Sequence, residues 1–250
     1  FEPVAPRSVP TDVYEQIVTG VLSGELAVGA TLPSERELAR ILGVSRPAVR
    51  EALGRVAAAG LVSIRQGGST KVLDPAVAGG LDLLPRLLVR DGELDPRVAR
   101  SVVEARALVG PEVAELAARR AAADVVPALS AILDELAAEP DSIAQQVIAL
   151  EFWSRVIDAA DSIAFRLMYN SLRAAYEPAL PVLAAVLEPE IANIGGYRAV
   201  VDAIAARDPA RAGTAARALL APATDALLEM CAALIADDPE AVSYTHLRAH

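Results

Sequence analysis

LPSERELARILGVSRPAVREALGRVAAAGLVSIRQGGSTKV, residues 32–72, is the stretch that decides the fold of the first part of the chain. Ser34 and Ser45 each precede a segment with helical character. Serine is a favoured N-cap because its side-chain oxygen accepts a hydrogen bond from a free backbone N–H of the first turn. We therefore predict helices over 35–42 and 46–59, with a glycine-bearing tight turn between them.

A further helix and a hairpin are predicted on either side of this pair. Residues 12–23 carry apolar side chains at helical spacing behind Thr11, a plausible N-cap, and 25–31 is expected to be a loop. Downstream, two β-rich runs at 61–65 and 70–73 flank a turn that contains two glycines. Three helices followed by a two-stranded hairpin is the order of a winged helix-turn-helix.

The predicted third helix has two chemically different faces. An apolar stripe should pack on the other helices, whereas Arg46 and Arg50, one turn apart, fall on the opposite side. In a helix-turn-helix the N-terminal end of this helix enters the major groove, where an arginine fork can bond O6 and N7 of guanine together. Solvation alone would also explain exposed arginines. The residues expected at a DNA interface, wing included, are Arg36, Ser45, Arg46, Arg50, Gln66, Gly67, Gly68 and Lys71.

The stretch 32–72 and the upstream VYEQIVTGVLSGELAVGATLPSE together resemble the signature of the GntR family over about residues 10–73. The resemblance implies a winged-helix domain that reads double-stranded operator DNA. It also implies which positions contact that DNA, and each holds the residue type that the family pattern expects: Arg36, Ser45, Arg46, Arg50 and Gly67.

The second part of the chain reads as helical throughout. Alanine and leucine dominate from residue 96 to 236 and β-branched alternation is absent, which favours an all-α antiparallel bundle. About six helices are expected, over 96–121, 124–138, 141–159, 161–187, 190–206 and 209–236. The domains expected are a winged helix-turn-helix at 1–74, a linker with a short helix near 81–89 at 75–94, a helical effector-binding and dimerisation domain at 95–241, and a non-native tail at 242–250.

The tail VSYTHLRAH, residues 242–250, breaks with the texture of the body and resembles a translated sequencing-adapter sequence. It holds both histidines of the chain, His246 and His250. Without it no Ser-His-Asp triad, Cys-His pair or His-ligated metal site can form. The single cysteine, Cys231, leaves no internal disulfide. We therefore do not expect an enzyme.

Composition and charge place the chain among globular proteins of the cytosol. It has 250 residues, 54% of them apolar, and a formal net charge of −10. No uncharged run reaches the roughly 18 residues of a membrane span, and no signal-peptide pattern opens the chain. Residues 1–75 hold eight basic and eight acidic side chains, against 15 basic and 25 acidic beyond them. The first part is thus the one suited to DNA phosphates.

The helical part resembles the FCD branch of the same family, in the stretches 104–121, 149–172 and 197–220. Many FCD domains bind a metal through one aspartate and three histidines. The corresponding positions here are Ala149, Trp153, Tyr197 and Leu219, which do not suit a divalent ion. A family glutamate is also replaced, by Gly110. We therefore expect no metal and no cofactor, and interpret Glu151, Asp158 and Asp161 as a solvated face.

The replacements favour an apolar pocket in place of a metal cage. Arg106 matches an FCD arginine and would pair with a carboxylate or phosphate. We expect an apolar, acyl-carboxylate or CoA-type effector, bound by Arg106, Ala149, Trp153, Tyr169, Arg173, Tyr197 and Leu219. The function expected is a ligand-responsive regulator of the repressor type that binds a palindrome as a homodimer. Two alternatives stay open: a constitutive DNA-binding dimer, and a metal-plus-carboxylate-responsive FCD regulator.

Overall fold

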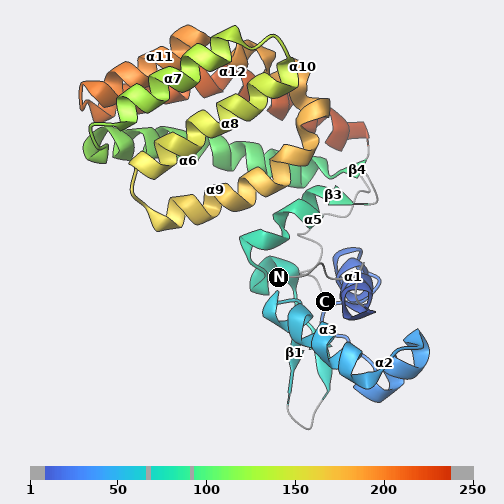
Figure 1. The fold of residues 1–250 in the computed structure, drawn as a ribbon. Coiled ribbons are helices and arrows are strands. Elements are labelled where there is room, and N and C mark those ends of the chain that lie inside the picture. Colours follow the sequence, from blue (N-terminus) through green and yellow to red (C-terminus); the bar gives the residue numbers. More distant parts are fainter. Residues whose placement is uncertain (1–8, 66–68, 91–92, 238–250) are drawn as a thin grey trace. The chain divides into compact units, whose positions relative to one another are not determined.

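The computed structural model describes residues 9–65, 69–90 and 93–237 (Figure 1). The described chain separates into two compact units, one ending at Leu83 and the other beginning at Leu84. Helices predominate in both. The first unit contains a small antiparallel hairpin in addition, and the second is a bundle of helices with one very short hairpin near its start.

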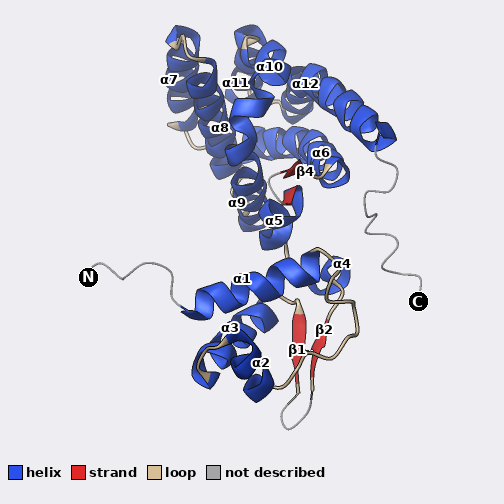
Figure 2. Ribbon diagram, turned by 90° about the vertical axis from the view of Figure 1, so that its right-hand side faces the viewer, coloured by secondary structure: helices blue, strands red, loops and turns tan. Residues whose placement is uncertain are grey.

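The first unit has the winged helix-turn-helix order (Figure 2). Its hairpin pairs antiparallel, with Val62 opposite Val72 and Ile64 opposite Thr70. The elements are α1 (Val9–Leu22), α2 (Glu35–Leu42), α3 (Arg46–Ala58), β1 (Val62–Ile64), β2 (Thr70–Val72), α4 (Pro75–Ala78) and the 3-10 turn η1 (Leu81–Leu83).

Two serine caps and one glycine set the turn between α2 and α3. The Ser34 hydroxyl accepts a hydrogen bond from the Glu37 N–H at 3.3 Å, and the Ser45 hydroxyl accepts one from the Ala48 N–H at 3.4 Å. Gly43 adopts φ 66°, the left-handed region that only glycine enters without strain, and its N–H bonds to the Ala39 carbonyl. Both predicted caps are confirmed.

The apolar stripe predicted on α3 forms the core of this unit. Its four residues are at most 2% exposed, and α3 packs against α1 and α2. The opposite side of the helix is therefore left to its charged residues. The stripe consists of Val49, Ala52, Leu53 and Val56.

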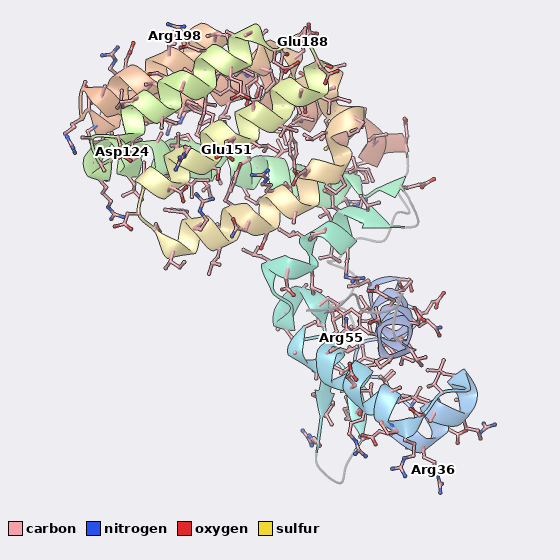
Figure 3. All side chains as sticks on the ribbon, viewed as in Figure 1. Arg36, Arg55, Asp124, Glu151, Glu188 and Arg198 are labelled. Carbon is pink, nitrogen blue, oxygen red and sulfur yellow. The ribbon has the colours of Figure 1, made fainter. Side chains whose placement is uncertain are left out.

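The start of the unit differs from the expectation in two ways. The first helix begins at Val9, so Thr11 lies inside α1 and is not its N-cap; instead, its hydroxyl accepts a hydrogen bond from Arg55 at 3.1 Å. Arg55, labelled in Figure 3, also covers the Tyr14 ring at 4.4 Å. The expected loop at 25–31 ends in extended chain that pairs with β2, since the Leu32 N–H donates to the Thr70 carbonyl at 2.8 Å.

The second unit is the predicted all-α bundle. Helices α6 and α12 pack side by side, and α11 packs against both. At the centre of the bundle the Phe152 and Tyr197 rings meet edge to face, 4.9 Å apart. The elements are α5 (Leu84–Leu88), β3 (Val89–Arg90), β4 (Glu93–Leu94), α6 (Pro96–Arg120), α7 (Val125–Ala138), α8 (Ser142–Ala159), α9 (Ile163–Tyr176), the 3-10 turn η2 (Glu177–Ala179), α10 (Leu180–Ile191), α11 (Ile194–Ala205) and α12 (Pro209–Asp237).

Two expectations about this unit are wrong. The helix expected over 161–187 is broken at η2, where Pro178 lacks the N–H that a continuing helix needs, and Pro189, the expected break, lies inside α10. The short helix expected near 81–89 is divided into η1 and α5, and the β3–β4 hairpin follows it.

Helix α12 is, among the described residues, long and apolar enough to cross a membrane by length and composition. It packs along α6 and contributes residues such as Leu220 and Leu227 to the core of the bundle. A core helix passes the same test, so this one gives only weak evidence for a membrane span.

Candidate functional site

The basic side chains predicted at a DNA interface lie on the exposed side of α2, α3 and the hairpin. Arg36 extends from α2 away from the helices (Figure 3), and Ser45, Arg46 and Arg50 are exposed at the N-terminal half of α3. Lys71 is exposed on β2. The remaining predicted wing residues, Gln66, Gly67 and Gly68, lie outside the described residues.

A carboxylate that we did not predict organises this face. Glu35, the first residue of α2, accepts hydrogen bonds from Arg50 Nε at 3.0 Å and from Arg50 Nη2 at 2.7 Å. Its Oε2 also lies 3.8 Å from Arg46 Nη2. The hydrogen bond from Arg50 lowers the pKa of Glu35, so the carboxylate stays ionised. One acid thus pairs with both arginines at the N-terminal end of α3.

The second unit contains a cavity of about 110 Å³. Its walls come from α6, α8, α9 and α10, with Leu220 of α12. Most of the lining is apolar, which suits a carbon-rich ligand. The apolar and aromatic lining includes Val102, Val109, Val113, Leu150, Ile157, Phe165, Leu172, Tyr176, Leu187 and Ile191.

Five of the seven residues predicted to bind an effector line this cavity: Arg106, Ala149, Trp153, Tyr169 and Arg173. Tyr197 and Leu219 do not. Both are at most 1% exposed and belong to the core of the bundle, where Tyr197 packs against Phe152. Their helices, α11 and α12, pack together in the bundle as expected. The sequence does not show which side of each helix faces the cavity.

A buried ion pair forms one part of the cavity wall. Arg106 of α6 donates a hydrogen bond from Nη2 to Oε1 of Glu190 in α10. Glu190 is 2% exposed, and its burial raises its pKa even though Arg106 opposes the shift. For Arg106 burial opposes the charged form, but Glu190 outweighs burial and raises its pKa. Glu190 was not among the predicted site residues, and no local motif marks it.

Several polar atoms in the cavity wall have no hydrogen-bond partner among the described residues. They are Arg106 Nη1, both side-chain atoms Nε2 and Oε1 of Gln146, Trp153 Nε1 and Glu190 Oε2. Gln146 is 2% exposed, so water does not reach it freely. Buried polar groups in proteins are nearly always paired. These unpaired atoms belong to side chains of α6, α8 and α10 that line the cavity, which makes it a candidate ligand site.

The other two polar residues of the lining already have protein partners. The Tyr169 hydroxyl donates to the Leu150 carbonyl at 2.5 Å, and burial raises the pKa of Tyr169. Arg173 donates to Glu177 at 3.4 Å and lies 4.0 Å from Glu151, which Figure 3 labels on α8. Tyr169 and Arg173 therefore contribute to the shape of the cavity, and their polar groups already have hydrogen-bond partners in the protein.

The position of the missing family glutamate is tightly packed. A Cβ atom at Gly110 would lie 2.5 Å from Leu220 Cδ1 and 3.9 Å from Trp153 Cη2. Only glycine therefore fits here without a shift of Leu220. Within the described residues, no group of three or more His, Cys, Asp or Glu side chains is arranged to hold a metal ion.

Comparison with known proteins agrees with this architecture. Residues 10–72 match the model for bacterial regulatory proteins of the gntR family, and residues 101–222 match the FCD domain. The HTH-type transcriptional regulator Mce2R of Mycobacterium tuberculosis is 52% identical over 228 residues, which cover 91% of this chain and 95% of that protein. The chain belongs to the GntR family. It is a DNA-binding transcriptional regulator with an FCD domain, and not an enzyme.

More distant relatives share parts of this GntR regulator. An uncharacterised HTH-type regulator of M. tuberculosis, Rv0494, is 31% identical and covers 88% of this chain and 90% of its own. The fatty acid metabolism regulator of Vibrio cholerae is 34% identical over 95 residues, 38% of this chain and 34% of that protein. The solved structure of Lar from Listeria monocytogenes has a TM-score of 0.57 at 16% identity, covering 91% of this chain and all of that one, and so shares the fold.

Proposed function

We propose that this regulator binds a palindromic operator as a homodimer, and that a small molecule in the cavity of its helical unit changes its affinity for that operator. One helix-turn-helix reads one half-site, so a palindrome calls for two-fold symmetry in the protein. A coupling free energy of about 1–3 kcal/mol between ligand and DNA would be typical. Such a regulator acts where its DNA lies, in the cytoplasm.

On the DNA side, we assign the arginines of α2 and α3 to the major groove. Arg46 and Arg50 would read guanine edges, and Arg36 would reach the same groove. Ser45, at the N-terminus of α3, is suited to a phosphate contact. The wing residues Gln66, Gly67 and Gly68 together with Lys71 would contact the adjacent backbone or minor groove. The exposure of Arg36, Arg46 and Arg50, and the shared contact of Arg46 and Arg50 with Glu35, support this assignment.

On the ligand side, the observation that carries the proposal is the cluster of unpaired polar atoms in an otherwise apolar cavity. This combination suits a molecule with a carbon-rich body and one compact polar head. The similarity to the fatty acid metabolism regulator of Vibrio cholerae supports an acyl-type body. We infer that Arg106 and Trp153 bond the head while Ala149 and the apolar lining enclose the body.

Native mass spectrometry of the full chain tests this function, alone and with an operator duplex obtained by selection from random DNA. We expect a mass of two chains, two chains on each duplex, and an organic molecule bound to the dimer. One chain per duplex would contradict the dimer. One divalent ion per chain would contradict the proposed ligand class and favour a metal-plus-carboxylate regulator. A dimer whose operator affinity responds to no ligand would be a constitutive DNA-binding protein.

A further inference from the structure

The buried pair in the cavity wall limits the charge of the ligand, provided that the cavity is the effector site proposed above. Arg106 and Glu190 come from different helices, α6 and α10, and their charges cancel. Arg106, which we predicted from the sequence to bind an anionic group, is therefore already paired with Glu190. Glu190 is 84 residues away from it, so no local sequence pattern indicates the pairing.

The unpaired atoms of the wall include donors and acceptors in nearly equal number. Arg106 Nη1, Trp153 Nε1 and Gln146 Nε2 are free to donate, whereas Gln146 Oε1 and Glu190 Oε2 are free to accept. Gln146 and Glu190 are both 2% exposed, so the two acceptors are as buried as the donors. A head group that only accepts hydrogen bonds would leave both acceptors unpaired.

A carboxylate is such a head group, and it also carries the wrong charge. It would bring a second negative charge beside the buried Glu190, where like charges repel more strongly than in water. A primary carboxamide instead offers an N–H₂ group to Glu190 Oε2 and a carbonyl oxygen to the Arg106 and Trp153 donors. We propose that the cavity takes a small neutral ligand whose head group both donates and accepts hydrogen bonds, a carboxamide or an alcohol, in place of a carboxylate.

The cavity volume sets the size of the probe. A cavity of roughly 150 Å³ lined by apolar side chains accepts benzene, and this one measures about 110 Å³. A six-carbon molecule is therefore a suitable choice. Hexanamide, 1-hexanol and sodium hexanoate share a straight carbon chain of equal length and differ in the head group alone.

The experiment titrates each probe into the full-length protein at pH 8 and follows the fluorescence of Trp153. Trp153 is the single tryptophan of the chain and lines the cavity, so the signal reports on this site. We expect hexanamide to bind at least tenfold more tightly than hexanoate, and 1-hexanol to bind more tightly than hexanoate as well. Hexanoate binding as tightly as hexanamide would overturn the inference.

A substitution of Glu190 provides a second, independent test of the inference. Glu190→Gln has nearly the same shape but leaves the charge of Arg106 uncancelled, so the affinity for hexanoate relative to hexanamide should rise by at least tenfold. Glu188→Gln is the matched control, because Glu188 is exposed on the same helix (Figure 3), and its ratio should equal that of the wild type. An unchanged ratio in folded Glu190→Gln would overturn the inference. The wild-type comparison of the three probes stands even if this variant does not fold.

The outcomes separate this inference from the function on which it rests. If hexanoate binds best and changes operator affinity, the head-group inference fails while the ligand-responsive function stands. If none of the three probes binds, the head-group inference fails and the cavity loses its support as an effector site. If hexanamide binds best and Glu190→Gln shifts the preference toward hexanoate, the inference holds.

Discussion

The carboxylate of Glu35, at the start of α2, accepts three hydrogen bonds from the guanidinium of Arg50 in α3, from Nε at 3.0 and 3.2 Å and from Nη2 at 2.7 Å. The same carboxylate lies 3.8 Å from Arg46. An arginine fork that is already oriented loses less conformational freedom when it meets a base edge. The two helices of the motif are thus joined at the surface where DNA is expected to bind.

Removal of the Arg50 side chain should weaken specific binding to the operator. We expect Arg50→Ala to weaken operator binding by about 1–3 kcal/mol. It should also relax the preference for the base that Arg50 contacts. Fluorescence anisotropy with the selected operator and single-base variants of it measures both effects. Arg198→Ala, which removes an exposed arginine of the helical unit, is the control and should leave the affinity unchanged. Equal operator affinity for Arg50→Ala would show that the recognition face lies elsewhere.

Removal of the Glu35 carboxylate should make the DNA-facing surface more positive. In Glu35→Gln, Arg46 and Arg50 keep their charges without a carboxylate partner, so binding to random DNA should tighten several-fold while the ratio of specific to non-specific affinity falls. Salt titrations on operator and scrambled duplexes measure this ratio. Glu37→Gln, which breaks a pair with Arg40 within α2, should change it much less. A ratio equal to that of the wild type would mean that Glu35 does not position the arginines.

Local sequence chemistry was enough to predict the DNA-binding half. The caps at Ser34 and Ser45 and the glycine turn are short-range features, and both α2 and the start of α3 fall where the pattern indicates. The ion pair between Glu35 and Arg50 was not predicted, because it joins residues 15 positions apart on different helices. Thr11 was misplaced for a related reason, since its partner Arg55 is 44 residues away.

The indole N–H of Trp153 should matter to the ligand and not to DNA. Trp153→Phe removes an unpaired donor of the cavity wall while it keeps an aromatic ring in place. We expect operator affinity without ligand to stay within about twofold of the wild type, and the affinity for hexanamide to fall by about tenfold, the equivalent of 1.4 kcal/mol for one lost hydrogen bond. Calorimetric titration replaces fluorescence here. Unchanged hexanamide binding would place the ligand elsewhere.

The buried Tyr197 and the partly buried Tyr169 should respond to loss of their hydroxyl groups with opposite signs. The Tyr197 hydroxyl has no partner among the described residues, so Tyr197→Phe should raise the free energy of unfolding by about 1 kcal/mol. Tyr169 donates to the Leu150 carbonyl, so Tyr169→Phe should lower it by about 0.5–1.5 kcal/mol. Urea unfolding at neutral pH measures both. A destabilised Tyr197→Phe would reveal a partner for that hydroxyl.

An apolar side chain grown into the cavity should mimic a ligand. Ala149 is 4% exposed and lines the cavity, so Ala149→Met should fill part of it and weaken hexanamide binding by tenfold or more. Operator affinity should move in the same direction as it does when ligand binds, because a filled cavity favours the same state of the helical unit. Ala144→Met lies on the same helix outside the lining and is the control. Undiminished hexanamide affinity in Ala149→Met would argue against this cavity.

The helical unit with its cavity was harder to predict from sequence. The helices that build the cavity follow from composition, but two buried polar residues of its lining, Gln146 and Glu190, lie in ordinary Ala- and Leu-rich segments. The break between α9 and α10 was placed wrongly, because a proline such as Pro189 is tolerated inside a helix that the tertiary structure supports. Which face of α11 and α12 points inward, and hence the burial of Tyr197 and Leu219 behind the cavity, depends on that packing.

The most direct test of ligand control is the dissociation constant of the full-length protein for its selected operator, measured by fluorescence anisotropy with and without saturating hexanamide at fixed salt. We predict a change of about 5- to 150-fold, the range of ordinary allosteric coupling, and no such change in Ala149→Met. A constant that stays the same in the wild type, while Trp153 fluorescence shows the cavity to be occupied, would contradict the claim that this site controls DNA binding.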